Sequence, residues 1–178
     1  MLYPRQNTPA LSVETLSHGH YNLANEIPKN FSLIVFYRGL HCPLCAKYLI
    51  ELERLVPEFE KRGVNVIALS SDNRERTQQM ADKVQAKNLR FAYGVTLEVA
   101  RNWGLYISES RGKTSIGIEE PALFSEPGVF MVRPDQTLYY GNVQTMPFAR
   151  PNFNDLVGGL DFILANDYPA RGEYLGAI

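Results

Sequence analysis

Two short runs of β-branched and aromatic residues, separated by one amphipathic segment, constrain the fold of this chain most strongly. The runs Phe-Ser-Leu-Ile-Val-Phe-Tyr at 31–37 and Val-Asn-Val-Ile-Ala-Leu at 64–69 are too short for solitary helices and predict doubly buried strands. Between them, apolar residues recur at helical spacing from Leu44 to Phe59, a helix that Pro57 is expected to kink and Gly63 to end. A strand, a helix and a strand in this order predict two parallel strands joined by a right-handed crossover.

Three helices, a strand and a hairpin are expected after the second strand. Either Ser71 or Asp72 is expected to cap a helix whose apolar face carries Thr77, Met80, Ala81 and Val84. Beyond it the patterns predict a strand near 91–93, a short helix over 97–103, a hairpin of 129–133 with 137–141, and a final helix from Phe153 to Leu164. This order predicts an α/β fold, a three-layer α/β/α sandwich with a mixed central sheet.

Two segments lack clear periodicity. Residues 1–27 are polar and rich in turn residues, and we interpret them as an N-terminal extension, containing a hairpin, that precedes one larger domain over 28–178. Residues 108–126 contain Gly, Ser, Pro and charges and are expected to form a loop or insertion.

Composition narrows the classes of function. The 178 residues are 45% hydrophobic and 21% charged, which excludes a disordered chain and a disulfide-dense scaffold. The 18 Lys+Arg against 19 Asp+Glu show no basic excess, so no nucleic-acid partner is expected. No run reaches the roughly 18 apolar residues that cross a bilayer, and the first ten residues lack the basic and apolar regions of a secretory signal. We therefore expect a cytoplasmic protein without a membrane partner, whose cysteines are reduced at rest.

The two cysteines form the motif Cys42-Pro43-Leu44-Cys45 at the end of a predicted strand and the start of a helix. In this context a C-x-x-C motif predicts redox chemistry. Cys42 lies in the first helical turn, opened by Pro43, where the helix dipole and free N–H groups favour its thiolate. We expect Cys42 to attack and Cys45, more buried and less acidic, to resolve the mixed disulfide. No cofactor is expected beyond this redox-active disulfide.

Two other roles for the cysteines remain open from the residues alone. They could be reduced side chains that fill space. Alternatively, Cys42, Cys45 and His41 could join His18 or His20 in a Cys2His2 metal site. Donors adjacent in sequence at a helix start converge poorly on one ion, so we expect no metal.

The residues Phe-Tyr-Arg-Gly-Leu-His-Cys-Pro-Leu-Cys at 36–45 resemble the AhpC/TSA-type redoxins, or peroxiredoxin-like proteins, of the thioredoxin-like superfamily. The likeness continues through Leu97–Gly104, Pro127–Asp135 and Met146–Pro151, and so covers roughly 28–165. It implies a thioredoxin-like fold and a thiol-dependent oxidoreductase.

The chain also departs from that family. Peroxiredoxins are similar around a P-x-x-x-T/S-x-x-C motif, in which the hydroxyl and an arginine polarise the peroxide. Here Gly39 stands at the Thr/Ser position and Val35 at the proline position; with a shortened loop, Arg38 falls at the proline instead. The family's later arginine falls on Pro127. A proline there resembles the cis-proline of thioredoxins, which shapes the groove for a disulfide substrate, and we expect a cis Glu126–Pro127 bond.

Four other residues are candidates for the site. Arg38 could stabilise the thiolate or a peroxide oxygen, or could pair with a carboxylate at a strand end. His41 could tune the pKa of Cys42 or lie exposed. Met146 and Phe148 lie in the loop that enters the last helix, which borders the active site in thioredoxin-like folds, and could form apolar lips for substrate.

Three functions follow from these observations. The first is thiol–disulfide exchange through Cys42 and Cys45. The second is peroxidase activity, in which hydrogen peroxide or an organic hydroperoxide forms a Cys42 sulfenate that Cys45 resolves. The third is a metal-carrying or redox-regulated binding module. Expected partners are a reductant such as thioredoxin or glutathione, a peroxide or protein-disulfide substrate, and other copies of the chain in an oligomer.

Overall fold

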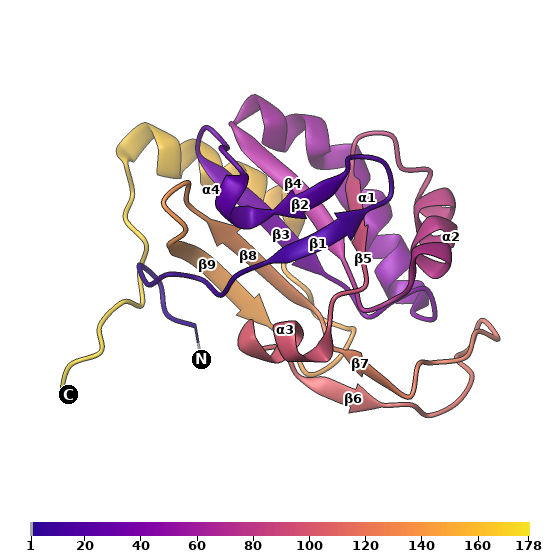
Figure 1. The fold of residues 1–178 in the computed structure, drawn as a ribbon. Coiled ribbons are helices and arrows are strands. Elements are labelled where there is room, and N and C mark those ends of the chain that lie inside the picture. The colour runs from indigo at the N-terminus through magenta and orange to yellow at the C-terminus, as the bar shows by residue number, and fades with distance from the viewer. Residues whose placement is uncertain (1) are drawn as a thin grey trace.

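A mixed sheet of seven strands forms the centre of the computed structural model, which describes residues 2–178 (Figure 1). The strand order is β2-β1-β5-β4-β3-β8-β9. Strands β3, β4 and β5 are parallel, and the others join antiparallel. The predicted α/β sandwich with a mixed sheet is confirmed. The strand bounds are β1 Ser12–Thr15, β2 His20–Asn22, β3 Phe31–Phe36, β4 Val64–Leu69, β5 Arg90–Tyr93, β8 Gly128–Val132 and β9 Leu138–Val143.

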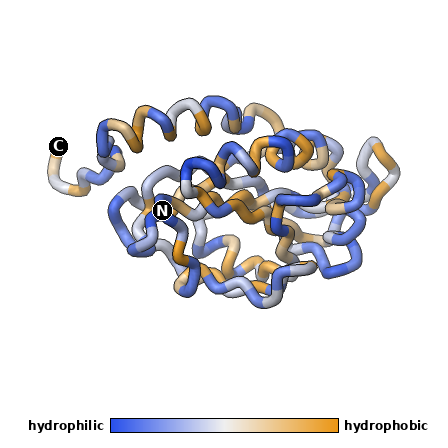
Figure 2. The backbone as a smooth tube through the Cα atoms, turned by 90° about the horizontal axis from the view of Figure 1, so that it is seen from above, coloured by the Kyte–Doolittle hydropathy of each residue, from blue (hydrophilic) through white to orange (hydrophobic). Residues whose placement is uncertain are grey.

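Helices cover both faces of this sheet. Helices α1 (Pro43–Lys61), α2 (Arg74–Val84) and α4 (Phe153–Asn166) pack on one face, and α3 (Leu97–Asn102) with the 3-10 helix η1 (Leu23–Asn25) on the other. The strands serve both layers because alternate side chains point to opposite faces. In β3, Val35 lies in the core under α1, whereas Phe36 packs against Trp103 on the opposite face. Along α4, hydrophobic and hydrophilic stretches alternate (Figure 2).

The cap of α2 differs from the prediction. Asn73 is the N-cap, and its side chain accepts a hydrogen bond from the N–H of Arg76 at 2.9 Å. Asp72 is not free to cap, because its buried carboxylate accepts the Leu40 N–H at 2.7 Å and pairs with the Arg76 guanidinium at 2.9 Å. Asp72 therefore ties α2 to the turn that precedes Cys42.

The segments without periodicity are more ordered than the sequence suggests. Residues 12–22 form the predicted hairpin, β1 with β2, which extends the sheet through β5. The segment 108–126, predicted as a loop, contains most of a two-stranded pair, β6 (Ile107–Glu109) with β7 (Leu123–Ser125). The hairpin of β8 with β9 is confirmed, and α1 continues through Pro57 to Lys61. None of the helices within residues 2–178 has the length and apolar character of a membrane span.

Candidate active site

Cys42 lies at the N-terminus of α1, where the polypeptide leaves β3. It is the N-cap residue, and its Sγ accepts the backbone N–H of Cys45 at 3.3 Å. Pro43 occupies the first turn, where its missing N–H removes no helical hydrogen bond. The positive end of the helix dipole and this N–H therefore both favour a Cys42 thiolate.

The two thiols differ in acidity although both are buried, with 1% of Cys42 and none of Cys45 exposed. A hydrogen bond from the Cys45 thiol is the main cause that lowers the pKa of Cys42. Burial opposes this shift, but the Cys45 N–H and the cations Arg150 and Arg38 add to it and bring that pKa to about 6. Burial raises the pKa of Cys45 well above its ordinary value. Cys42 is thus the more acidic thiol, as predicted, while its role as nucleophile and that of Cys45 as resolving thiol stay predictions.

Arg150 is the cation that contacts both sulfurs. Its Nη2 lies 3.0 Å from the Sγ of Cys45 and 3.9 Å from that of Cys42. The thiolate nevertheless belongs to Cys42, because Cys42 accepts a backbone N–H and Cys45 is held neutral by burial. Sequence reasoning missed Arg150, although it considered Met146 and Phe148 from the same loop. A guanidinium between two prolines, at the entrance to the last helix, was the available signal.

The loop that carries Arg150 is fixed to α1 and to itself. The Nε of Arg150 donates to the Pro147 carbonyl at 2.9 Å, and the guanidinium lies 5.0 Å from the ring of Tyr48. The Tyr48 hydroxyl donates to the Pro151 carbonyl at 2.6 Å, and its ring stacks on Phe153 of α4. One N–H group of Arg150, Nη1, is buried without an acceptor among the described residues. The site thus holds a guanidinium with an unused donor beside two thiols.

Arg38 is engaged chiefly by carboxylates of the segment 108–126. Its Nε lies 3.3 Å from Glu126 and its Nη2 lies 3.6 Å from Glu120, both largely buried. Its guanidinium also covers the ring of Phe124 at 4.7 Å. Of the two roles considered for Arg38, pairing with carboxylates is the one that the structure shows, and it contributes to the low pKa of Cys42 only as a lesser charge.

His41 is buried rather than exposed. Its ring packs edge-on against Phe124 at 4.7 Å, and neither ring nitrogen has a hydrogen-bond partner among residues 2–178. Burial, with a smaller contribution from Arg38, lowers the pKa of His41 to about 4. His41 is therefore neutral at pH 7 and brings no positive charge to Cys42.

A hollow of about 370 Å³ lies beside Arg150, between α1 and the loop that enters α4. Phe148, 59% exposed, lines it, whereas Met146 does not. The remaining walls are Leu44, Lys47, Tyr48, Glu51, Pro147, Ala149, Arg150, Pro151 and Asn152. Of the two predicted apolar residues, Phe148 therefore lies at this hollow and Met146 does not. Arg150 lines the hollow and also contacts both sulfurs.

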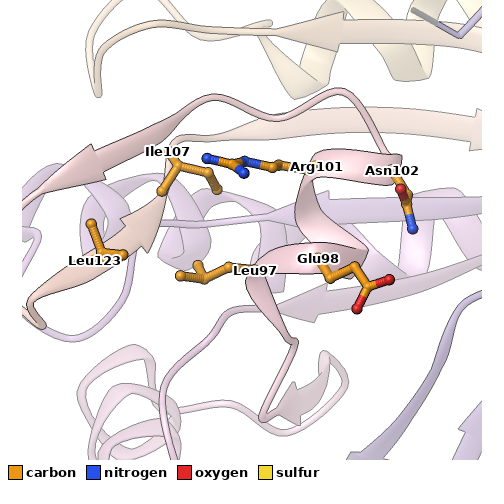
Figure 3. Close-up of a pocket in the computed structure, with 6 residues that line it drawn as sticks. All are labelled: Leu97, Glu98, Arg101, Asn102, Ile107 and Leu123. Carbon is orange, nitrogen blue, oxygen red and sulfur yellow. The ribbon is translucent and has the colours of Figure 1, made fainter.

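Figure 3 shows a second hollow, of about 310 Å³, between α3 and the β6–β7 pair. Its walls are Leu97, Glu98, Arg101, Asn102, Ile107 and Leu123. Neither cysteine lines either hollow, but Arg150, which contacts both sulfurs, lines the first and not the second, so the first hollow is the one beside the thiols.

The histidines of the possible metal set lie away from the cysteines. His18 and His20 belong to the β1–β2 hairpin, and β1, β5 and β4 separate β2 from β3. His20 is bonded to Glu14 and Ser12, both at 2.7 Å. Within the described part of the chain, no three His, Cys, Asp or Glu side chains gather as a metal site would require. The Cys2His2 alternative therefore lacks its geometry.

Comparison with known proteins identifies the family. The model of the AhpC/TSA family matches residues 4–141, which is most of the chain. The chain belongs to the AhpC/TSA family.

Relatives of this AhpC/TSA chain are named peroxiredoxins. The 1-Cys peroxiredoxin of Dictyostelium discoideum is 26% identical over 154 residues, which are 85% of this chain and 61% of that protein. The chain therefore spans less than two thirds of that relative. The C45S mutant of peroxiredoxin 6 of Arenicola marina has a TM-score of 0.72 at 19% identity, over 93% of this chain and 76% of that one. A yeast mitochondrial 1-Cys peroxiredoxin has a TM-score of 0.70 at 17% identity, over 94% and 78%. These neighbours confirm the thioredoxin-like fold.

The departure of this AhpC/TSA protein at Gly39 has a steric reason. Gly39 has a φ of +137°, and a Cβ on it would lie 2.8 Å from the carboxylate of Asp72. A threonine or serine at this position would meet Asp72, so the family's hydroxyl donor has no room here.

The second departure, at Pro127, was predicted with the wrong isomer. No peptide bond within residues 2–178 is cis, so the bond between Glu126 and Pro127 is trans. The Glu126 N–H donates to the Tyr106 carbonyl and so continues the pairing of β7, while the Pro127 carbonyl accepts from Gln144. The chain therefore runs from β7 into β8 without the tight turn that a cis bond serves.

Proposed function

We propose that this protein is a thiol-dependent peroxidase that reduces hydroperoxides through a Cys42–Cys45 dithiol/disulfide cycle. The observation that carries the proposal is the Cys42 thiol at a helix N-terminus, with its lowered pKa, beside a second thiol and the Arg150 guanidinium. Membership of the AhpC/TSA family and the peroxiredoxin relatives support it.

The proposed peroxidase reaction has two oxidative steps, followed by reduction of the disulfide. The Cys42 thiolate attacks one peroxide oxygen, the O–O bond breaks, and the leaving oxygen takes a proton from solvent to give water or an alcohol. Cys42 becomes a sulfenic acid. Cys45 then attacks the Cys42 sulfur, the hydroxyl leaves with the Cys45 proton as water, and a disulfide forms. Two external thiols return the two electrons.

Arg150 can supply the hydrogen-bond donor and the positive charge that the family's hydroxyl and later arginine provide and that Gly39 and Pro127 lack. Its Nη2 contacts the sulfurs, and its buried Nη1 has a free N–H that could donate to the peroxide oxygen that gains charge. A single guanidinium thereby serves both the nucleophile and the leaving group.

Thiol–disulfide exchange is the second candidate function. The C-x-x-C motif at a helix start and the missing hydroxyl at Gly39 favour it. The same Cys42 would attack a protein disulfide, and Cys45 would release the product. Either activity needs an external reductant, and the yeast 1-Cys peroxiredoxin structure describes thiol resolution through glutathione/thioredoxin systems.

Stopped-flow oxidation of the reduced protein by hydrogen peroxide tests the proposal. Trp103 packs against Phe36 and Phe130 on the sheet face opposite α1, so the ultraviolet absorbance of the thiolate is the better signal. We expect rapid loss of both thiols, none in Cys42→Ser, and a sulfenic acid that persists in Cys45→Ser. Oxidation no faster than that of a small free thiol would leave exchange as the function.

A further inference from the structure

Three side chains of the β1–β2 hairpin form a hydrogen-bonded chain away from the cysteines. The hydroxyl of Ser12 lies 2.7 Å from Nε2 of His20, and Nδ1 of His20 lies 2.7 Å from a carboxylate oxygen of Glu14. A hydroxyl, an imidazole and a carboxylate linked in this order are the groups that activate a serine for acyl transfer. The hairpin lies at the edge of the sheet that ends in β2, and β1, β5 and β4 separate β2 from β3 (Figure 1).

The strand register holds these groups on one face of the hairpin. Ser12 and Glu14 are two residues apart on β1, so their side chains point to the same face, and both are exposed. His20 is the direct partner of Glu14 on β2, and Asn22 is the direct partner of Ser12. Directly opposed residues of an antiparallel pair have Cβ atoms about 4.5–5.5 Å apart. The arrangement therefore rests on the pairing of two strands and not on a loop.

Glu14 fixes the proton of the neutral imidazole of His20 on Nδ1. An ionised carboxylate only accepts hydrogen bonds, so Nδ1 is the donor in its contact with Glu14. Nε2 of the neutral ring is then an acceptor, and the hydroxyl of Ser12 donates to it. His20 is thereby in the tautomer that takes the proton of Ser12, as a general base must.

The Asn22 amide supplies a hydrogen-bond donor next to Ser12. Its Oδ1 accepts the N–H of Ala24 at 3.0 Å, which leaves the two N–H groups of Nδ2 to donate elsewhere. Donors of this kind stabilise the oxygen that gains charge when a carbonyl group is attacked. Ser12, Glu14, His20 and Asn22 are all polar and none of the four is buried. The surroundings therefore suit a small, soluble ester.

We propose that Ser12, His20 and Glu14 form a second reactive site, which hydrolyses small esters independently of the cysteines. The Ser12 oxygen attacks the carbonyl carbon while its proton moves to Nε2 of His20, and the Asn22 amide donates to the carbonyl oxygen, now negative. The bond to the alcohol then breaks, and His20 gives its proton to the leaving oxygen. A water molecule, deprotonated by His20, attacks the acyl group, and the acid leaves as Ser12 regains its proton. Glu14 is a positioning residue, because it acts through His20.

Hydrolysis of p-nitrophenyl acetate by the full chain carrying Cys42→Ser and Cys45→Ser tests this site, because these substitutions remove the thiols that would also attack the ester. We expect a burst of p-nitrophenol followed by slower turnover, and neither in Ser12→Ala. His20→Ala should lower the rate about a hundredfold, the lower end of what a general base contributes. Glu14→Gln should lower kcat about tenfold and leave KM unchanged, because Glu14 does not touch the ester.

The neighbouring pair of Ser17 and His18 is a matched control. The Ser17 hydroxyl lies 3.0 Å from Nδ1 of His18, but no carboxylate of residues 2–178 is bonded to that ring. Ser17→Ala should therefore leave the rate unchanged. In the wild-type protein, a fluorophosphonate reagent should label Ser12 and not Ser17, as mass spectrometry of the peptides would show.

The outcomes separate this site from the peroxidase. A burst that survives Ser12→Ala, or a wild-type protein whose Ser12 is not labelled, would overturn the proposal. Neither result bears on the cysteine cycle, because the esterase assay uses a chain without cysteines. The substituted side chains of the hairpin are exposed, while Val13 and Tyr21 anchor it in the core, so circular dichroism should show that each variant folds.

Discussion

The substitution Arg150→Met removes the charge beside the thiols while keeping an apolar side chain over Tyr48. Nη2 of Arg150 lies 3.9 Å from the Cys42 sulfur. Unit charges at that distance interact by about 1 kcal/mol in water and about 4 kcal/mol at an effective dielectric constant of about 20. Hydrogen bonds from Cys45 lower the pKa of Cys42 more than Arg150 does, so the smaller value applies. We therefore expect that pKa to rise by about one unit, equivalent to about 1.4 kcal/mol.

Two reagents separate the roles of Arg150. From a pKa of about 6 in the wild type, a rise of about one unit lowers the thiolate fraction at pH 7 from about 90% to about 50%. Alkylation by iodoacetamide should then slow about twofold at pH 7 and not at all at pH 9. The reaction with hydrogen peroxide should slow about a hundredfold at both pH values, because a donor to the leaving oxygen is lost.

Arg101→Met, at an exposed arginine of α3, is the control for the loss of a positive charge. The pKa itself is measured from the pH dependence of thiolate absorbance, and circular dichroism establishes that each variant folds. An Arg150→Met protein with an unchanged thiolate pKa and an unchanged peroxide rate would refute the reasoning. A loss in the peroxide rate no greater than that in alkylation would limit Arg150 to stabilising the thiolate.

Three further predictions concern neighbouring groups. Cys45→Ala should raise the pKa of Cys42 by more than Arg150→Met does, because the thiol of Cys45 is the main group that lowers it; thiolate absorbance against pH measures this. His41→Phe should reduce the loss of stability on acidification from pH 6.5 to 4. Between these pH values His41 is protonated in the unfolded chain but stays neutral in the native protein, where its pKa is about 4. This difference lowers the free energy of unfolding of the wild type by about 3 kcal/mol, which urea titrations measure. Gly39→Ala should destabilise the fold by about 2–4 kcal/mol because its Cβ meets a carboxylate, whereas Gly94→Ala, at a φ of +72° with open space around it, should cost about 1 kcal/mol in the same titrations.

Local patterns in the sequence were sufficient for the elements that present Cys42. The apolar, β-branched run 31–36 favours a strand buried on both faces, and a proline at position 43 favours the first turn of a helix. The place of Cys42 at a helix N-terminus follows from these two neighbours along the chain, and the helix supplies one N–H to its sulfur. Its low pKa depends more on the thiol of Cys45, one turn further along α1. The same local patterns gave the wrong N-cap for α2, because they do not show that the Asp72 carboxylate is bonded to the Leu40 N–H and to Arg76.

The sequence by itself therefore determined the redox pair and the sheet that carries it, while the tertiary structure decided what surrounds the pair. Arg150 reaches Cys45 from 105 residues further along the chain, and its loop is held against α1 by the stacking of Tyr48 on Phe153 and the hydrogen bond from Tyr48 to the Pro151 carbonyl. His41 is buried because β7 lies over it. Contacts of this range leave no periodic or spacing signal, since they depend on how α1, α4 and β7 pack together in three dimensions and not on neighbours along the chain.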